Sequence, residues 1–206
     1  MKSKHIFLVS VLAAFFLFCG CTVINPGPPP TLYTLSPEMP GPERGPVLPY
    51  QLTVSLVNTS PAVATRRIAV RPEDNEIRYF SGVSWIELAP DLVKRFQIEA
   101  LESTGRLEAV SDDMAGFLPN YRLSLELRDF SVHYTPKPVV EINLTARLIN
   151  LKNGKSIGFL RVEKQRETSD SSFGKVISAF DDVTSSALQE ITRWTIVRLE
   201  KLDAQQ

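Results

Sequence analysis

The alternation of apolar and polar side chains between residues 121 and 167 constrains the fold of this chain more than any other feature. A period of two residues predicts half-buried strands. The apolar positions are Tyr121, Leu123, Leu125, Leu127, Phe130, Val132, Tyr134, Val140, Ile142, Leu144, Ala146 and Leu148. Their change of parity at Arg128-Asp129 predicts a β-bulge within the first strand. Asn153-Gly154 predicts a two-residue type I′ turn into a third strand over 157–167, so the segment should form an antiparallel meander.

The remaining segments predict further strands and two helices. We expect strands at 51–59 and 106–110, and a hairpin that joins 67–71 to 77–80 through a polar turn. A helix should begin at Pro90 and end at Gly105, with Leu92, Val93, Phe96 and Ala100 on one apolar stripe. A second helix should run over 172–202, and residues 181–186 are its weak middle, where any kink or break in so long a helix would fall. This order predicts an α+β domain with a mixed, mainly antiparallel sheet covered by two helices.

The N-terminus has the pattern of a secretory signal. Lys2 and Lys4 precede an uncharged apolar run over 6–18, which is too short for a bilayer span of ~20 residues. Cys19-Gly20-Cys21 then resembles a lipobox, in which the final cysteine receives the lipid. We therefore predict a signal peptide over residues 1–20 and lipidation at Cys21. An ordinary cleavable signal or an uncleaved anchor are the alternatives.

Prolines punctuate the segment after Cys21. We interpret residues 21–50 as a semi-rigid tether with a short edge strand at Thr31–Leu35, and residues 51–206 as the folded domain. Cleavage would remove two lysines from 23 basic residues and leave 23 acidic ones, a net charge of −2. That balance argues against non-specific nucleic-acid binding. Cys21 would be the one cysteine left, which excludes a disulfide within the mature chain and a cysteine-based metal cluster.

The sequence lacks the motifs of an enzyme. It has no nucleophile elbow, phosphate loop or His-x-x-x-His pattern, so we expect no catalytic, cofactor-binding or metal-binding residues. We interpret His133 as a surface residue without partners and Trp85 as a core residue. Phe117, Leu118 and Phe173 lie in expected loops, outside every periodic apolar stripe. Exposed apolar loop residues favour a surface for partner contact.

Several short motifs, taken in order, resemble the ABC-type transport auxiliary lipoproteins, the PqiC-like family. The matching residues are Leu32–Leu35 after the lipobox, Arg67–Arg71, Trp85 before Leu88 and Leu92, Tyr121–Leu123 before Asp129-Phe130, Ala146–Asn150 and Ile191–Trp194. Family members carry Ala-Glu-Pro after the tryptophan. This chain has Ile86-Glu87-Leu88-Ala89-Pro90, which changes the local loop.

The resemblance implies a role in an ABC transport system whose MCE-domain protein bridges the periplasm and moves lipids. We expect a non-catalytic lipoprotein that docks this MCE-domain partner, is attached to the membrane through its lipid, and forms a homo-oligomer. By analogy with enteric sorting, Thr22 in place of aspartate favours the periplasmic face of the outer membrane. The alternatives are an envelope-assembly lipoprotein that acts on outer-membrane proteins or peptidoglycan, and a small hydrolase.

Overall fold

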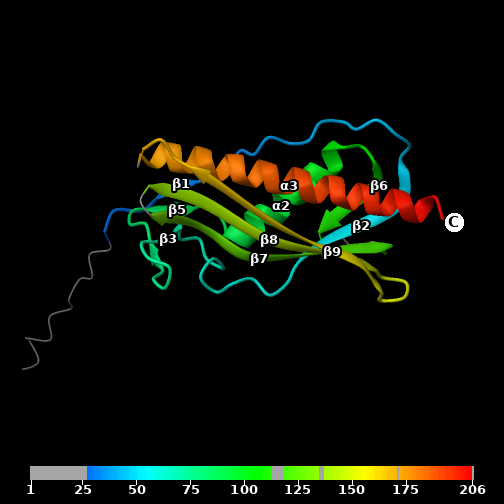
Figure 1. The fold of residues 1–206 in the computed structure, drawn as a ribbon, viewed down its shortest axis with the longest axis horizontal. Helices are drawn as coiled ribbons and strands as arrows, with labels where there is room; N and C mark the ends of the chain where they lie inside the picture. Colours follow the sequence, from blue (N-terminus) through cyan, green and yellow to red (C-terminus); the bar gives the residue numbers. More distant parts are fainter. Residues whose placement is uncertain (1–26, 113–117, 135–136, 171, 206) are drawn as a thin grey trace, which may run out of the picture.

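The computed structural model describes residues 27–112, 118–134, 137–170 and 172–205. The elements in chain order are β1 (Thr31–Tyr33), β2 (Leu48–Leu56), β3 (Ala69–Arg71), β4 (Arg78–Tyr79), β5 (Val83–Trp85), α2 (Ala89–Ser103), β6 (Leu107–Asp112), β7 (Tyr121–Tyr134), β8 (Pro138–Asn150), β9 (Ser156–Glu167) and α3 (Phe173–Asp203). Figure 1 shows that they build one elongated molecule, with α3 running along most of its length. No helix in the described part of the chain combines the length and hydrophobicity that a membrane span needs.

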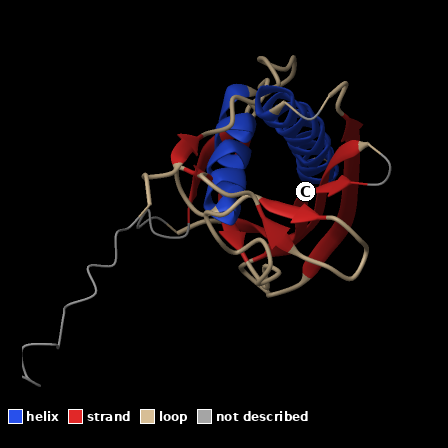
Figure 2. Ribbon diagram, turned by 90° about the vertical axis from the view of Figure 1, so that its left-hand side faces the viewer, coloured by secondary structure: helices blue, strands red, loops and turns tan. Residues whose placement is uncertain are grey.

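The predicted α+β architecture is confirmed. Strand β7 lies in the middle of a seven-stranded sheet, antiparallel to β8 on one side and parallel to both β2 and β3 on the other. The antiparallel β7–β8 and β8–β9 ladders are the longest, so the mixed sheet is mainly antiparallel. Strands β1 and β5 form a separate parallel pair. Viewed along the long axis in Figure 2, both helices cover the same side of the curved sheet.

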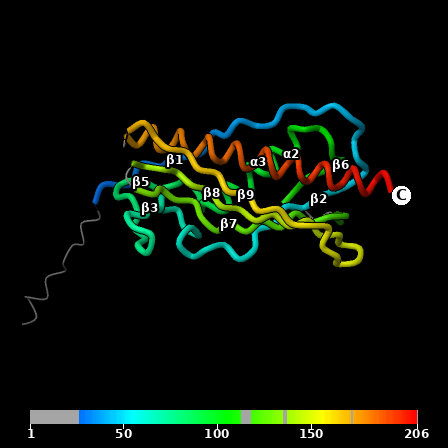
Figure 3. The backbone as a smooth tube through the Cα atoms, viewed as in Figure 1, coloured from blue at the N-terminus to red at the C-terminus, as the bar shows by residue number. Residues whose placement is uncertain are grey.

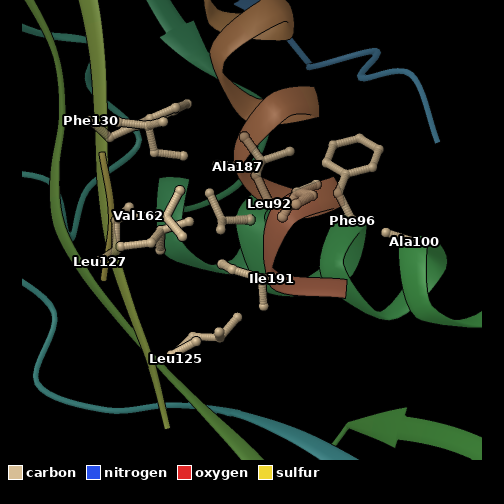
Figure 4. Packing of buried hydrophobic residues seen from close by; sticks show 14 of the residues in the cluster. Leu92, Phe96, Ala100, Leu125, Leu127, Phe130, Val162, Ala187 and Ile191 are labelled. Atoms are coloured by element: carbon tan, nitrogen blue, oxygen red, sulfur yellow. The ribbon is translucent and has the colours of Figure 1, made fainter. Parts of the chain in front are cut away.

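The meander forms in the predicted register. The β7–β8 ladder shifts between Leu127 and Asp129, which is the predicted bulge. Leucines before the bulge and Phe130 after it therefore all face the helices and are buried. In Figure 4, Leu125, Leu127 and Val162 from the sheet lie opposite Ala187 and Ile191 of α3.

The turn between β8 and β9 differs from the predicted type I′ turn. Gly154 has a φ of +68°, but Asn153 is not among the described residues with positive φ. The Gly154 N–H donates to the Asn150 carbonyl at 2.8 Å, and Asn150 N–H donates to the Lys155 carbonyl at 2.9 Å. A longer loop therefore joins the strands. The Asn153 side-chain oxygen accepts the Lys155 N–H at 2.9 Å, so this side chain bonds to the loop backbone two residues on.

Helix α2 has the predicted ends. Pro90 and Asp91 lie in its first turn, where a missing N–H and a negative charge are tolerated or favoured. Gly105 follows the helix with a φ of +63°, a conformation that suits glycine at a helix end.

Helix α3 continues without a break for 31 residues. The hydroxyls of Ser185 and Ser186 donate to the carbonyls of Asp181 and Asp182 one turn earlier. These polar side chains thus find partners inside the helix and do not interrupt it.

Residues 34–47, which we call the strap, pack on the domain, although the sequence interpretation placed them in a tether. Leu35 is 2% exposed and belongs to the core. The strap backbone is bonded to α3: Ser36 N–H donates to Asp181 Oδ1 at 2.7 Å and Glu38 N–H donates to Ser185 Oγ at 2.8 Å. In Figure 1 the blue segment runs beside α3. The folded domain therefore begins before residue 35 and not at residue 51.

Trp85 is a core residue, as predicted. Its ring stacks on Phe130 with centroids 5.6 Å apart and meets Phe180 edge-on at 5.1 Å. Phe130 and Phe180 also contact each other at 4.6 Å. This aromatic cluster joins β5, β7 and α3, so the short β1–β5 pair is fixed to the main sheet and the long helix.

Candidate functional site

The structure separates the residues that the sequence grouped as partner contacts. Phe117 lies outside the described residues. The side chain of Leu118 is 92% exposed and next to β7. Phe173 is the first residue of α3 and not part of a loop. Its half-buried ring contacts Tyr33 at 4.9 Å and Phe80 at 5.2 Å, so it already has intramolecular packing partners.

Leu118 and Phe173 lie at opposite ends of the molecule. Leu118 precedes the first residue of β7, whereas Phe173 contacts Phe80, which packs 6.5 Å from Tyr134 at the end of that strand. Strand β7 has 14 residues, and a strand rises ~3.3 Å per residue, so its ends are roughly 40 Å apart. Figure 3 shows β1, β5 and β3 at one end and the C-terminus at the other. We call these the β1 end and the Leu118 end.

Two tyrosines give the Leu118 end a rigid polar hollow. A cavity of about 210 Å³ is lined by Tyr50, Asn120, Tyr121, Asn150 and Lys152. The Tyr50 and Tyr121 rings meet edge-on at 5.1 Å, and the Tyr50 hydroxyl donates to Asp203 Oδ1 at 3.2 Å. Asn120 Oδ1 accepts the Gln51 N–H at 2.8 Å, which fixes the approach to β7.

The phenol of Tyr121 stays neutral in this setting. Burial raises its pKa, and the nearby Asp203 carboxylate raises it further, while the hydrogen bond with Tyr50 acts in the opposite direction. The exposed Leu118 and a hollow lined by two tyrosines, a residue type enriched at protein interfaces, therefore lie at the same end of the sheet.

The sequence could identify Leu118 but not this hollow. Leu118 belongs to no periodic stripe, which made it a candidate. Tyr50 and Tyr121 are far apart in the chain and meet because Leu52 of β2 pairs in parallel with Tyr121 of β7. Only the parallel register, which has no local sequence signal, brings them together.

His133 is not an isolated surface residue, contrary to the sequence interpretation. Its Nε2 lies 3.6 Å from Glu141 Oε2 and 3.9 Å from Asp129 Oδ2. The Ser131 hydroxyl is 3.3 Å from the same nitrogen and 2.6 Å from Asp129 Oδ1. The cross-strand pairing of Ser131 with Glu141 builds this cluster on the sheet face away from the helices.

The His133 cluster holds its own counter-charges. One ligand atom each from Asp129, His133 and Glu141 lies within 4.8 Å of the others, close enough to share a cation. However, the Arg71 guanidinium is 3.0 Å from Asp129 Oδ2, and Gln165 Nε2 donates to Glu141 Oε2 at 2.8 Å. These contacts already occupy both carboxylates. We therefore describe the cluster as a polar network that joins β3, β7, β8 and β9.

Two larger hollows follow α3 beside the strap. They have volumes of about 500 and 660 Å³, and Glu38, Ser186 and Gln189 line both. Two ion pairs lie on their walls, with Lys164 Nζ 2.5 Å from Glu190 and Arg166 Nε 3.3 Å from Asp182. Their polar walls do not suit the apolar chains of a lipid.

Comparisons with known proteins agree with this fold. A family model described as the ABC-type transport auxiliary lipoprotein component matches residues 33–192. The crystal structure of protein XCC0632 from Xanthomonas campestris superposes with a TM-score of 0.78 at 23% identity, over 85% of this chain and 99% of that one. The crystal structure of a second, uncharacterised protein superposes with a TM-score of 0.64 at 12% identity, over 82% of this chain and 99% of that one. At these identities the two structures show the fold alone.

One curated relative matches part of the sequence. It is the uncharacterised protein bll6063 of Bradyrhizobium diazoefficiens, which is 25% identical over 118 residues. The match covers 57% of this chain and 32% of the relative, so this chain spans about a third of that protein's length.

Proposed function

The chain belongs to the ABC-type transport auxiliary lipoprotein family, and from this membership we propose that it docks the periplasm-spanning component of an ABC transport system at the membrane. The family match covers residues 33–192 and confirms the resemblance that the short motifs indicated. In this proposal the chain is a non-catalytic auxiliary subunit. Its partner is an MCE-domain protein, and the transported material is lipid.

The observation that carries this proposal is the Leu118 end. Leu118 is 92% exposed, and the hollow lined in part by Tyr50 and Tyr121 lies at the same end of the sheet. The mature chain would have a net charge close to zero, so it offers little electrostatic steering toward a partner. Apolar contact must then provide most of the affinity, and Leu118 is placed to provide it.

The anchor completes the arrangement. We propose that Cys21 carries the lipid, that the protein lies on the periplasmic face of the outer membrane, and that several copies assemble into a ring or other homo-oligomer. A ring would repeat the Leu118 surface around one axis and so multiply weak contacts with the partner.

Binding to the purified MCE-domain partner tests the docking surface. Burying a leucine contributes about 1.5–3 kcal/mol, so Leu118→Ser should weaken binding by roughly one to two orders of magnitude. Phe159→Ser is the matched control, because Phe159 is 66% exposed on β9. Equal binding by both variants and the unchanged protein would place the docking surface elsewhere.

A photo-crosslinking amino acid at position 118 identifies the partner in cells. A crosslink to the MCE-domain protein supports the proposal. A crosslink to an outer-membrane protein or to peptidoglycan would favour an envelope-assembly role instead.

Labelling with palmitate tests the anchor. Cys21→Ala should yield a precursor that incorporates no labelled palmitate, whereas the unchanged chain should incorporate it. Incorporation by the variant would show that Cys21 is not the lipidated residue.

A further inference from the structure

The β1–β5 pair presents aliphatic side chains on its outward face. Leu32 pairs in register with Ser84, and Tyr33 pairs with Trp85, which is buried. Because side chains alternate along a strand, Leu32 and Ile86 lie on the face opposite Trp85. Ile86 follows β5 directly, and its N–H donates to the Tyr33 carbonyl at 2.8 Å, which holds it beside β1.

These side chains are exposed in the structure. Leu32 is 56% exposed and Ile86 49%, and Leu88, two residues further on, is 42% exposed. An outward strand position beside Ser84 would be expected to be polar in a domain surrounded by water. We call Leu32, Ile86 and Leu88 the apolar edge.

The backbone of a basic residue, Arg66, lies next to the apolar edge. The Arg66 carbonyl accepts hydrogen bonds from Trp85 N–H at 2.7 Å and from the Ser84 hydroxyl at 2.8 Å, so Arg66 is a direct neighbour of β5. The side chains of Arg66 and Arg67 are exposed, and the Arg67 guanidinium lies 3.7 Å from the centroid of the Tyr79 ring. The nearby acidic residue Glu87 is paired with Arg95 at 2.9 Å, which limits its repulsion of anionic groups.

The length of chain before β1 places this end close to the membrane. Thr31 lies ten positions after Cys21, and an extended chain spans at most ~3.6 Å per residue, so the lipid lies within roughly 35 Å of β1. The opposite end lies roughly 45 Å from β1, the length of the 31 residues of α3 at ~1.5 Å per residue, which is more than the chain before β1 can span. Figure 1 shows the first described residues and β1 together at the end remote from the C-terminus.

We propose that the apolar edge inserts into the headgroup region of the anchoring phospholipid bilayer, with Arg66 and Arg67 on lipid phosphates. This inference rests on the proposed lipidation of Cys21. The anchor keeps the edge at a high local concentration near the bilayer, so even weak apolar contacts are populated. The contact fixes the orientation of the domain and points the Leu118 end away from the membrane, toward the partner.

Fluorescence quenching in vesicles tests the contact. The lipidated full chain is placed in phosphatidylethanolamine–phosphatidylglycerol vesicles, with an environment-sensitive dye on Leu32→Cys or Ile86→Cys. Cleavage removes Cys19 and a thioether to diacylglycerol blocks the Cys21 sulfur, so the introduced cysteine is the only reactive thiol. The matched controls are Leu118→Cys and Phe159→Cys, whose parent side chains are also exposed and apolar.

Nitroxide-labelled lipid should quench dyes at positions 32 and 86 and shift their emission to the blue, while the controls respond only to aqueous iodide. The double substitution Leu32→Gln with Ile86→Gln should abolish lipid quenching of a dye on Leu88→Cys. Dyes at 32 and 86 that respond only to iodide would overturn the proposal. Dyes shielded from both quenchers would also overturn it, because a protein surface would then cover the edge.

Flotation of the same vesicles separates the two proposals. Protein that floats with the vesicles is anchored, whichever quencher reaches the apolar edge. A floating chain with aqueous dyes at 32 and 86 therefore overturns the bilayer contact alone. A Cys21→Ala chain that floats as well as the unchanged chain would contradict the anchor.

Discussion

Asp181 lies where the strap crosses α3, and ionisation of its carboxyl group lowers the stability of the fold. Burial raises the pKa of this group above its ordinary value, the hydrogen bond from the Ser36 N–H lowers the pKa in part, and the neighbouring charge of Asp182 raises it again. When the pKa of a carboxyl is higher in the folded than in the unfolded protein, the protonated form stabilises the fold. This stabilisation is complete at a pH below the unfolded-state pKa and is lost as the pH rises through the folded-state pKa. The charged carboxylate therefore opposes folding at neutral pH.

We predict that Asp181→Asn raises the melting temperature at pH 7 by a few degrees at most, because asparagine keeps an acceptor for Ser36 without the charge. The advantage should shrink as the pH falls toward 4, where the aspartate becomes protonated. Asp170→Asn is the control and should lower the melting temperature at pH 7, because a hydrogen bond from Ser172 lowers the pKa of Asp170 and so favours its charged form. Thermal unfolding from pH 4 to pH 7 measures both, and a destabilised Asp181→Asn at pH 7 would contradict this account.

Gly45 is required where the strap passes over Arg106. The buried guanidinium of Arg106 donates to the carbonyls of Pro46 and Arg44 and lies 2.6 Å from Glu200 Oε1. A Cβ on Gly45 would stand 2.6 Å from the guanidinium carbon, and its φ is +138°. The side chain of Arg106 has no free space to move because its bonds hold it from several directions.

Gly45→Ala should thus lower the free energy of unfolding by roughly 1–3 kcal/mol, the usual cost of strained backbone. Gly41→Ala, in the same strap, meets nothing within 4 Å and should change stability by less than about 0.5 kcal/mol. Urea unfolding of the two variants measures the difference. Equal stability of the two variants would mean that the strap at position 45 is not in close contact with the Arg106 guanidinium.

At the scale of elements, the β8–β9 loop separates the roles of Asn153 and Gly154. Only Gly154 has a positive φ, +68°, and a β-branched residue there is strained. Gly154→Val should cost about 1–2 kcal/mol by this strain. Asn153→Val loses one side-chain acceptor on an exposed loop and should cost about 0.5–1 kcal/mol. Thermal unfolding compares the stability of the two variants. Equal losses of stability would favour a type I′ turn, with positive φ at both positions, and contradict this account.

The elements that the sequence predicted well are those whose signals are local. The meander, its bulge at Asp129 and both ends of α2 follow from alternation, proline and glycine placed next to one another in the chain. The surroundings of His133 could not be predicted in this way. They depend on which residue of β8 lies opposite Ser131, and the shift at the bulge decides that register.

The continuity of α3 was also not predictable from local propensity. Serine, threonine and aspartate in its middle weaken an isolated helix. In the folded protein, Val183 and Ala187 on the same stretch are buried against the sheet, and Ser36 and Glu38 of the strap bond to its polar side. Tertiary packing therefore overrides the weak local preference.

At the scale of the whole molecule, the boundary of the domain depends on one buried leucine. Proline spacing indicated a tether as far as residue 50, because it reports on backbone stiffness and carries no information about what the chain packs against. Leu35, within that stretch, belongs to the same core cluster as Trp85 and Phe180. The strap is therefore part of the folding unit, and its loss should destabilise the whole domain.

Leu35→Ala tests this boundary. Truncating a buried leucine costs about 2–5 kcal/mol, and the loss should appear in the single cooperative unfolding transition of the unlipidated mature chain. Leu32→Ala is the matched control three residues earlier, because Leu32 is 56% exposed and its loss should change stability in water by less than about 0.5 kcal/mol. If Leu35→Ala unfolds at the same urea concentration as Leu32→Ala, the strap separates from the domain in solution, and the folded unit begins at β2.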